Sequence, residues 1–209
     1  MRPSRFVLWE VDAQEDFMLP DGKLYVPGAE KIIPNIRRLV GTAARTGTLL
    51  VSSACAHSEN DPEFKTFPPH CIKGTTGARI IREGMRDTFV TIPSDPAFRL
   101  SADALSARQL VIEKQMLDVF SNPHTAAIVE RLGSNAEHIV FGVVTEYCVA
   151  CAARGLLERG RRVHIVSDAI ETINIAEGRR ALGDLVSRGA QMIDTERAIA
   201  LLRHAHSDD

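Results

Sequence analysis

The segment Ile139-Val-Phe-Gly-Val-Val-Thr-Glu-Tyr-Cys148, which continues as Val149-Ala-Cys-Ala-Ala-Arg154, indicates most directly how this chain folds. Its first six residues are apolar and rich in β-branched side chains, as is typical of a strand covered on both faces. A tight turn is expected from Gly142 to Glu146. Alanine, leucine and arginine then favour a helix as far as Arg159, and Gly160 suits its C-terminal cap. The segment therefore predicts a buried strand that turns directly into a helix.

Cys148 is of chemical interest because it falls at or near the N-terminus of this predicted helix. Unpaired N–H groups and the helix macrodipole favour negative charge at such a position. They can lower the pKa of a thiol below its free value of about 8.5, which makes the thiolate accessible near neutral pH. The alternative is that Cys148 fills the core as a small apolar residue, the commoner fate of a cysteine. Its position alone does not separate a nucleophile from a core residue.

Apolar strand candidates alternate with helical segments along the chain, so a parallel sheet with helices on both faces is expected. The predicted strands are Phe6–Val11, Thr48–Ser53, Asp87–Ile92, Leu110–Glu113, Ile139–Val144 and Arg162–Ser167, with a short edge strand at Ala190–Ile193. The predicted helices are Gly28–Thr46, Pro123–Leu132, Val149–Arg159, Ala176–Ser187 and Glu196–His204. We therefore expect residues 1–209 to form a single three-layer α/β/α domain around a mainly parallel six-stranded sheet with strand order 3-2-1-4-5-6.

Three polar residues end strands that would be neighbours in this sheet. Binding sites in open parallel sheets lie at the carboxyl ends of the strands, where the strand order reverses. The assumed order places Asp12, Lys114 and Cys148 around one crevice. Asp12 could instead cap a turn, and Lys114 could be solvated, but the joint placement favours a reactive site. The long irregular segment Ala54–Arg86 also suggests a functional loop.

The composition limits the partners and the compartment. The chain has 44% hydrophobic and 25% charged residues and a net charge of −2, which gives no support to nucleic-acid binding. No apolar run approaches the roughly 20 residues that span a bilayer, and Phe6–Val11 is too short for a signal-peptide core. We therefore expect a cytoplasmic protein without a membrane partner. Its four cysteines, Cys55, Cys71, Cys148 and Cys151, are then expected as thiols or ligands, and a redox role for the last two would require a disulfide between them.

Three motifs occur in order along the chain. Val11-Asp-Ala-Gln-Glu-Asp-Phe17 is similar to V-D-x-Q-N-D-F, with Glu15 in place of Asn. Phe67-Pro-Pro-His-Cys-Ile-Lys-Gly-Thr75 is similar to W-P-P-H-C-x-x-G-T, with Phe in place of Trp. Gly142-Val-Val-Thr-Glu-Tyr-Cys-Val149 is similar to G-x-x-T-D-x-C-V, with Glu in place of Asp. With Lys114, these motifs resemble the cysteine hydrolases of the isochorismatase-like superfamily, and within it the nicotinamidase branch.

The resemblance implies a catalytic triad of Asp12, Lys114 and Cys148, and a cis peptide bond just before Val144. It also implies an oxyanion hole formed by the backbone N–H groups of Val144 and Cys148. The implied activity is hydrolysis of a small planar carboxamide, such as nicotinamide, to an acid and ammonia through a thioester intermediate. Asp12 would accept and return the proton while Lys114 holds it in place. Isochorismatases proper, which cleave a vinyl ether, lack this cysteine.

The resemblance also suggests how a substrate would be held. Phe17 and Phe67 are expected to sandwich a flat substrate, and Tyr147 to line the same pocket, although each could instead pack in the core. The loop Gln115–Ser121 lacks the S-A-F ending of nicotinamidases, so a carbamoyl or maleamate-like substrate is the alternative. Phe120, in this loop, is a further candidate for the pocket. Members of the family commonly form dimers or tetramers, so a homo-oligomer is expected.

A metal is implied near the triad, because nicotinamidases bind one with an Asp-x-His pair and the His of P-P-H-C. Here the pair reads Cys55-Ala56-His57, so the carboxylate is missing, whereas His70 is present. Cys55, His57 and His70 would together suit zinc, which accepts thiolate and imidazole ligands. Alternatively, Asp61 or Glu63 supplies the carboxylate, or no metal binds and the histidines contact the substrate.

Two hypotheses from other classes remain open. The first is metal-dependent hydrolysis at Cys55, His57 and His70, with Cys148 only structural. Chelation would then abolish the activity, and alkylation of Cys148 would not. The second is a catalytically silent binding module, against which the presence of all three triad residues argues.

Overall fold

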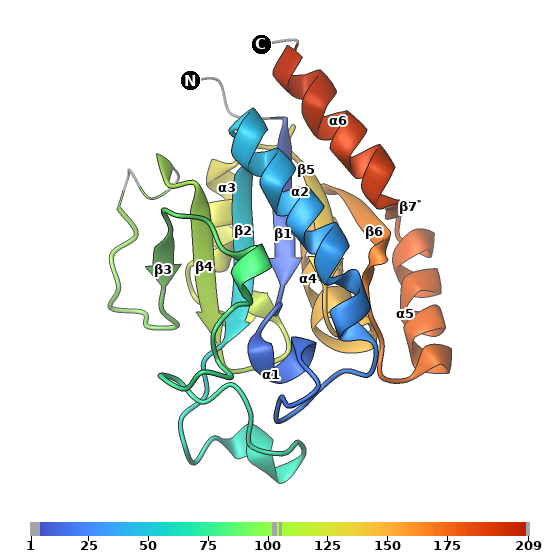
Figure 1. Ribbon diagram of the computed structural model, residues 1–209. Helices are drawn as coiled ribbons and strands as arrows, with labels where there is room; N and C mark the ends of the chain where they lie inside the picture. The colour runs from blue at the N-terminus through green and yellow to red at the C-terminus, as the bar shows by residue number, and fades with distance from the viewer. Residues whose placement is uncertain (1–4, 102–103, 105, 208–209) are drawn as a thin grey trace.

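The computed structural model describes residues 5–207 except 102, 103 and 105. It contains a seven-stranded sheet in the order β3-β4-β2-β1-β5-β6-β7, and all its strand pairs are parallel (Figure 1). The strands are β1 (Phe6–Val11), β2 (Leu49–Cys55), β3 (Val90–Ile92), β4 (Gln109–Lys114), β5 (Glu137–Gly142), β6 (Arg162–Ile170) and β7 (Gln191–Ile193). The helices are α1 (Glu15–Met18), α2 (Ile33–Thr46), α3 (Thr125–Arg131), α4 (Ala150–Glu158), α5 (Ile175–Ser187) and α6 (Thr195–Ser207).

Two apolar cores, one on each face of the sheet, confirm the expected three-layer α/β/α architecture. Phe6 and Leu8 of β1 belong to one core, which the apolar faces of α2 and α6 cover. Val7 and Trp9 belong to the other, which α3, α4 and α5 cover. Successive side chains of a strand point to opposite faces, so β1 supplies both cores at once and is buried along its whole length. None of the described helices is both long and apolar enough to cross a bilayer.

The strand order 3-2-1-4-5-6 is wrong in one respect, and the sheet has seven strands rather than six. β4 lies between β3 and β2, so it does not pair with β1. The burial of the two strands explains this difference. β4 is buried along almost its whole length, whereas β3 is three residues long with Thr91 exposed. A strand buried on both faces needs neighbours on both sides, and the short, half-exposed β3 suits the edge.

The turn after β5 also differs from the predicted strand-to-helix unit. β5 ends at Gly142, two residues earlier than expected, and Cys148 lies in a π-helical turn, Thr145–Val149, that precedes α4. Val149 N–H donates to Val144 O at 3.1 Å across this turn. Single π turns are rare and frequently occur at functional sites. The peptide bond between Val143 and Val144 is cis, as expected.

The segment between β2 and β3 is irregular, as predicted, and two side chains of the first motif hold it against the sheet. Gln14 Nε2 donates to Cys55 O at 2.8 Å and to Ala78 O at 2.7 Å. Asp16 Oδ2 accepts the backbone N–H of Cys71 at 2.7 Å. Both side chains are buried, which raises the energetic importance of these bonds. The segment therefore has a defined position over the carboxyl end of β2.

Gly142 leads to a prediction about stability. It has a φ of 117°, and a Cβ atom built there would lie 2.1 Å from the backbone oxygen of Val11. We expect Gly142→Ala to lower the free energy of unfolding by about 3 kcal/mol or more, measured by urea denaturation, because backbone strain and overpacking add. Gly133→Ala is the matched control. Its φ is 86° but no atom lies within 4 Å of the added Cβ, so only the smaller backbone cost should be seen. Equal losses in the two variants would contradict the steric explanation.

Candidate active site

Asp12, Lys114 and Cys148 meet at the carboxyl ends of the strands, although β4 and β1 are not neighbours. Lys114 is the last residue of β4, and its Nζ reaches past β2 to lie 2.8 Å from Asp12 Oδ2. The same Nζ lies 3.6 Å from Cys148 Sγ. Lys114 and Asp12 are each 1% exposed, and Cys148 is 6% exposed. The three residues singled out from the sequence therefore form one buried cluster.

Asp12 is held at both of its carboxylate oxygens. Ser53 Oγ donates to Oδ1 at 2.5 Å, and Lys114 occupies Oδ2. The backbone of Asp12 has a φ of 48°, in the left-handed region, where residues other than glycine are uncommon and often functional. An ion pair this deeply buried is tolerated only when its remaining hydrogen-bonding capacity is satisfied. Ser53 supplies that further bond, and the motif analysis did not identify it.

Burial determines the resting protonation of the cluster. Burial raises the pKa of the Cys148 thiol well above its usual value, and Asp12 raises it further while Lys114 opposes the rise. For Lys114, burial disfavours the charged form, but the charge of Asp12 and the hydrogen bond to it oppose this effect and raise the pKa of Lys114. The expected lowering of the Cys148 pKa is therefore wrong for the resting site, because desolvation beside a carboxylate outweighs the helix terminus. Burial and the neighbouring carboxylate thus favour the protonated form of the Cys148 thiol in the resting site.

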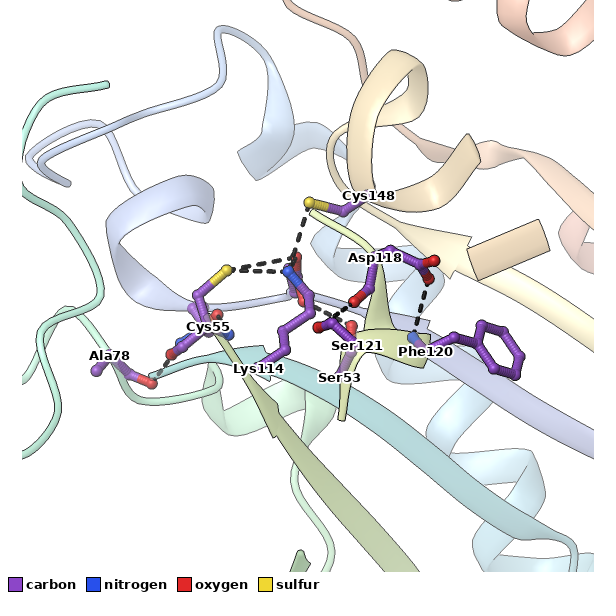
Figure 2. Close-up of polar contacts among 10 residues, drawn as sticks. Ser53, Cys55, Ala78, Lys114, Asp118, Phe120, Ser121 and Cys148 are labelled. Carbon is purple, nitrogen blue, oxygen red and sulfur yellow. Dashed lines mark hydrogen bonds and ion pairs between the residues drawn. The ribbon is translucent and has the colours of Figure 1, made fainter. Parts of the chain in front are cut away.

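Cys55 is a fourth member of this cluster. It pairs with Lys114 in the β2–β4 register, and its Sγ lies 3.1 Å from Lys114 Nζ and 3.7 Å from Asp12 Oδ2. Figure 2 shows the sulfurs of Cys55 and Cys148 directed toward the amine of Lys114. Burial raises the pKa of Cys55 to about 12. The sequence indicated Cys55 only as a metal ligand, because its contact with Lys114 follows from the strand order that was predicted incorrectly.

The structure brings Cys55, His57 and His70 together, with one ligand atom of each within 4.8 Å of the others. His57 Nδ1 lies 3.0 Å from Asp61 Oδ2, and His70 Nδ1 contacts Pro68 O at 2.8 Å. Both contacts are of the kind that orient metal-binding histidines and leave the second ring nitrogen free. Both ring nitrogens of His57 are buried, and among the described residues neither forms a hydrogen bond of good geometry, although Nδ1 lies close to Asp61. One sulfur and two nitrogens are ligand atoms that zinc accepts, so these three residues are suited to hold a zinc ion.

The carboxylates near this cluster have different positions. Asp61 Oδ2 lies beside His57 Nδ1, so Asp61 is placed to orient the ring of His57 and not to replace the missing aspartate. Glu63 lines the cavity beside Cys148, and burial raises the pKa of its carboxyl group. Of the two alternatives predicted from the sequence, Glu63 is therefore the one that faces the site.

The cavity beside Cys148 is small, with a volume of about 30 Å³, and its surface is mostly apolar. Phe17, Phe67 and Tyr147 all line it, as expected, and the rings of Phe67 and Tyr147 are 5.9 Å apart, edge to face. Leu117 and Ile173 complete the wall, and no motif identified them.

The positions of Phe120 and Glu146 were not predicted from the motifs. Phe120 does not reach the cavity, because its ring stacks on Trp9 and lies under the Arg159 guanidinium. Figure 2 shows Phe120 directed away from Cys148. Glu146, which replaces the motif aspartate, accepts the backbone N–H groups of Ile173 at 3.0 Å and Asn174 at 2.7 Å. Glu146 therefore fixes the loop that places Ile173 at the cavity.

Comparison with known proteins agrees with this geometry. The chain is 30% identical to streptothricin hydrolase of Streptomyces noursei over 79% of this chain and 49% of the relative, so it spans about half the length of that protein. It is 27% identical to a nicotinamidase of Acinetobacter baylyi over 90% of this chain and 92% of the relative. The structure is similar to that of the pyrazinamidase of Pyrococcus horikoshii in complex with zinc, with a TM-score of 0.72, 29% identity, and coverage of 91% of this chain and 99% of the other. The model of the isochorismatase domain matches residues 7–197. The chain therefore belongs to the isochorismatase family of hydrolases.

Proposed function

We propose that this protein is a cysteine amidohydrolase that converts a small planar carboxamide of the nicotinamide type to its acid and ammonia. The observation that carries this proposal is the buried cluster in which Lys114 Nζ contacts both Asp12 Oδ2 and Cys148 Sγ. An amide is a poor electrophile, so its hydrolysis needs an activated nucleophile and a site for the developing oxyanion. The aromatic side chains of Phe17, Phe67 and Tyr147 suit a flat substrate. Relatives named as nicotinamidase and pyrazinamidase support the same class.

The chemistry begins with proton transfer. Asp12 accepts the proton of the Cys148 thiol, and the sulfur attacks the carboxamide carbon. Lys114 stays charged and holds Asp12 through Oδ2, so the carboxylate keeps its position while the proton moves. The backbone N–H groups of Val144 and Cys148 would receive the negative charge that develops on the carbonyl oxygen.

The second half of the reaction returns the proton. Asp12 gives it to the departing nitrogen, ammonia leaves, and a thioester remains on Cys148. A water molecule then loses a proton to Asp12 and attacks the thioester. The acid leaves, and Asp12 returns the proton to the Cys148 sulfur, which restores the thiol. One carboxylate thus acts as base and then as acid in each half of the reaction.

Cys55, His57 and His70 would hold a zinc ion next to the proposed nucleophile, because their ligand atoms lie within 4.8 Å of one another. When bound, such an ion would act as a Lewis acid that orients a donor atom of the substrate. Asp61 would fix the ring of His57, and the Pro68 carbonyl that of His70, for this purpose.

A carbamoyl compound is the second candidate substrate. The wall of the cavity is mostly apolar but includes the Glu63 carboxyl group, which would oppose the carboxylate of a maleamate-like acid. A neutral carbamoyl group meets no such opposition. The expected homo-oligomer, a dimer or tetramer, and the cytoplasmic location stay predictions.

Substitution of the nucleophile is the direct test. We expect Cys148→Ala and Asp12→Asn each to lower kcat for ammonia release about 10⁴-fold or more, because the two residues act as a unit. The substrates to be screened are nicotinamide, pyrazinamide, a carbamoyl compound and an aliphatic amide. Cys151→Ala, which removes a half-buried thiol one turn further on, is the matched control and should keep full activity. Thermal denaturation of each variant separates loss of chemistry from loss of fold.

Two results would overturn the proposal. Cys148→Ala that retains activity, together with loss of activity on chelation, would favour metal-dependent hydrolysis. A wild-type enzyme that binds these amides without releasing ammonia would favour a binding module.

The raised pKa of Cys148 leads to a prediction about pH. A thiol whose pKa lies above the usual value of about 8.5 has less thiolate at neutral pH than a free cysteine. We therefore expect alkylation of Cys148 by iodoacetamide in the resting enzyme to rise with pH and reach half its maximum rate above pH 8.5. Mass spectrometry of the Cys148 peptide measures the rate. A midpoint below that of free cysteine would show that the thiolate already exists at rest.

The cluster of Cys55, His57 and His70 leads to a prediction that spectroscopy can test. We expect the protein to bind Zn²⁺ or Co²⁺ at one site per chain, and the Co²⁺ form to show a thiolate-to-metal absorption band in the near ultraviolet. Cys55→Asp should remove the band yet keep metal binding, because carboxylate replaces thiolate, whereas His70→Ala should weaken binding at least tenfold. Cys151→Ser is the control that keeps the band. A band that persists in Cys55→Asp would place the ion elsewhere.

A further inference from the structure

A large cavity lies away from Cys148, between α2, the turn Arg82–Gly84 and the start of β4. Its volume is about 790 Å³. We call it the arginine cleft, because Arg37, Arg82, Arg86 and Arg108 line it. Arg108 directly precedes β4 and Lys114 ends it, so the cleft and the catalytic cluster are roughly 20 Å apart at about 3.3 Å per residue. The turn Arg82–Gly84 lies beside α2 (Figure 1).

The charges of the cleft are unbalanced. Its four arginines face two acidic residues, Glu83 and Asp87, and Glu83 is already paired with Arg37 at 2.7 Å. In the part of the chain that the structure describes, the side chains of Arg82 and Arg108 form no hydrogen bond or ion pair. The cleft therefore presents positive charge that the protein itself does not neutralise.

Arg86 is the residue that points most directly to a missing partner. Its Nη1 is buried and has no hydrogen-bond partner. Burial and the like charge of Arg108 lower the pKa of Arg86. A buried donor without an acceptor costs free energy, more so on a charged group. An anion bound between Arg86 and Arg108 would offset the repulsion between these two guanidinium groups.

The backbone around Arg86 is fixed rather than adaptable. The side chain of Gln109 accepts the backbone N–H of Arg86 at 2.8 Å and donates to Gly84 O at 2.9 Å. Gln109 Nε2 also donates to Ser52 Oγ at 2.8 Å, which ties this turn to the interior of the sheet. A site that is fixed before binding has less ordering to do when a ligand arrives.

Gly41 of α2 leaves the cleft open. Glycine in the middle of a helix costs about 1 kcal/mol relative to alanine. The only neighbour of a Cβ built at Gly41 would be Arg45 Nη1 at 3.5 Å, so no packing contact explains the glycine. A larger side chain would project into the cleft, whose other apolar surface comes from Val40, Ala44 and Met85.

We propose that the arginine cleft binds an organic phosphate of nucleotide size. Arg82, Arg86 and Arg108 would hold its phosphoryl oxygens, since guanidinium groups bind phosphate through paired hydrogen bonds. Val40, Ala44 and Met85 would contact its organic part. The volume falls within the range of about 300–1,000 Å³ that is usual for small-molecule sites.

Calorimetric titration with ADP and with inorganic pyrophosphate tests this proposal. We expect saturable binding of ADP to one site per chain, at least tenfold tighter than that of pyrophosphate, because only ADP reaches the apolar surface. Arg82→Gln and Arg108→Gln should each weaken ADP binding about tenfold, since each removes a charge-assisted hydrogen bond. Gly41→Leu, which leaves the charge unchanged, should weaken it at least as much by filling the cleft.

Matched controls separate the cleft from general electrostatics and from the catalytic site. Arg131→Gln removes an exposed arginine on α3, outside the cleft, and should leave ADP affinity within twofold of wild type. Cys148→Ala should bind ADP as wild type does. The absence of saturable binding up to about 1 mM would overturn the proposal. Equal loss in Arg131→Gln, no loss in Gly41→Leu, or equal affinity for ADP and pyrophosphate would overturn it as well.

Discussion

The ion pair between Lys114 and Asp12 is the interaction on which the candidate site depends. Its two charges lie 2.8 Å apart and are almost wholly removed from solvent. Such a pair does little for stability unless its other hydrogen-bonding groups are satisfied. Here Ser53 Oγ binds the second carboxylate oxygen, and two thiols contact the amine. Three strands, β1, β2 and β4, must therefore keep their register for the pair to exist, and the amine of Lys114 then lies beside the Cys148 sulfur.

The sequence predicted much of this site because its chemistry falls at the ends of strands. Asp12, Lys114 and Cys148 follow apolar runs whose boundaries are visible in the sequence, and parallel strands end at a common edge. The pairing of β4 with β2 was not predictable in this way, because apolar character identifies a strand and not its neighbours. Lys114 still reaches Asp12, as predicted, because its long side chain spans the width of β2. The contact of Cys55 with Lys114 was missed because the pairing of β4 with β2 was not predicted, and the resting state of Cys148 depends on burial that a position at a helix terminus does not reveal.

Cys55 connects the two parts of the candidate site. Its sulfur contacts the amine of Lys114 and also completes the cluster with His57 and His70. An oxygen ligand at this position would carry a permanent negative charge beside Asp12, whereas a buried thiol stays neutral until an ion displaces its proton. An ion held by Cys55 would therefore change the charge next to Lys114 and Asp12. The replacement of aspartate by cysteine also makes softer ions the better match for the cluster.

The insertion of β4 between β3 and β2 has a consequence for how the chain acquires reactivity. The groups that surround the Cys148 sulfur come from strands far apart in the sequence, and contacts of this kind form late when a chain folds. A nascent or partly folded chain would carry Cys148 as an ordinary cysteine, with neither base nor ammonium beside it. The arrangement that the proposed chemistry needs therefore exists only once the sheet is complete.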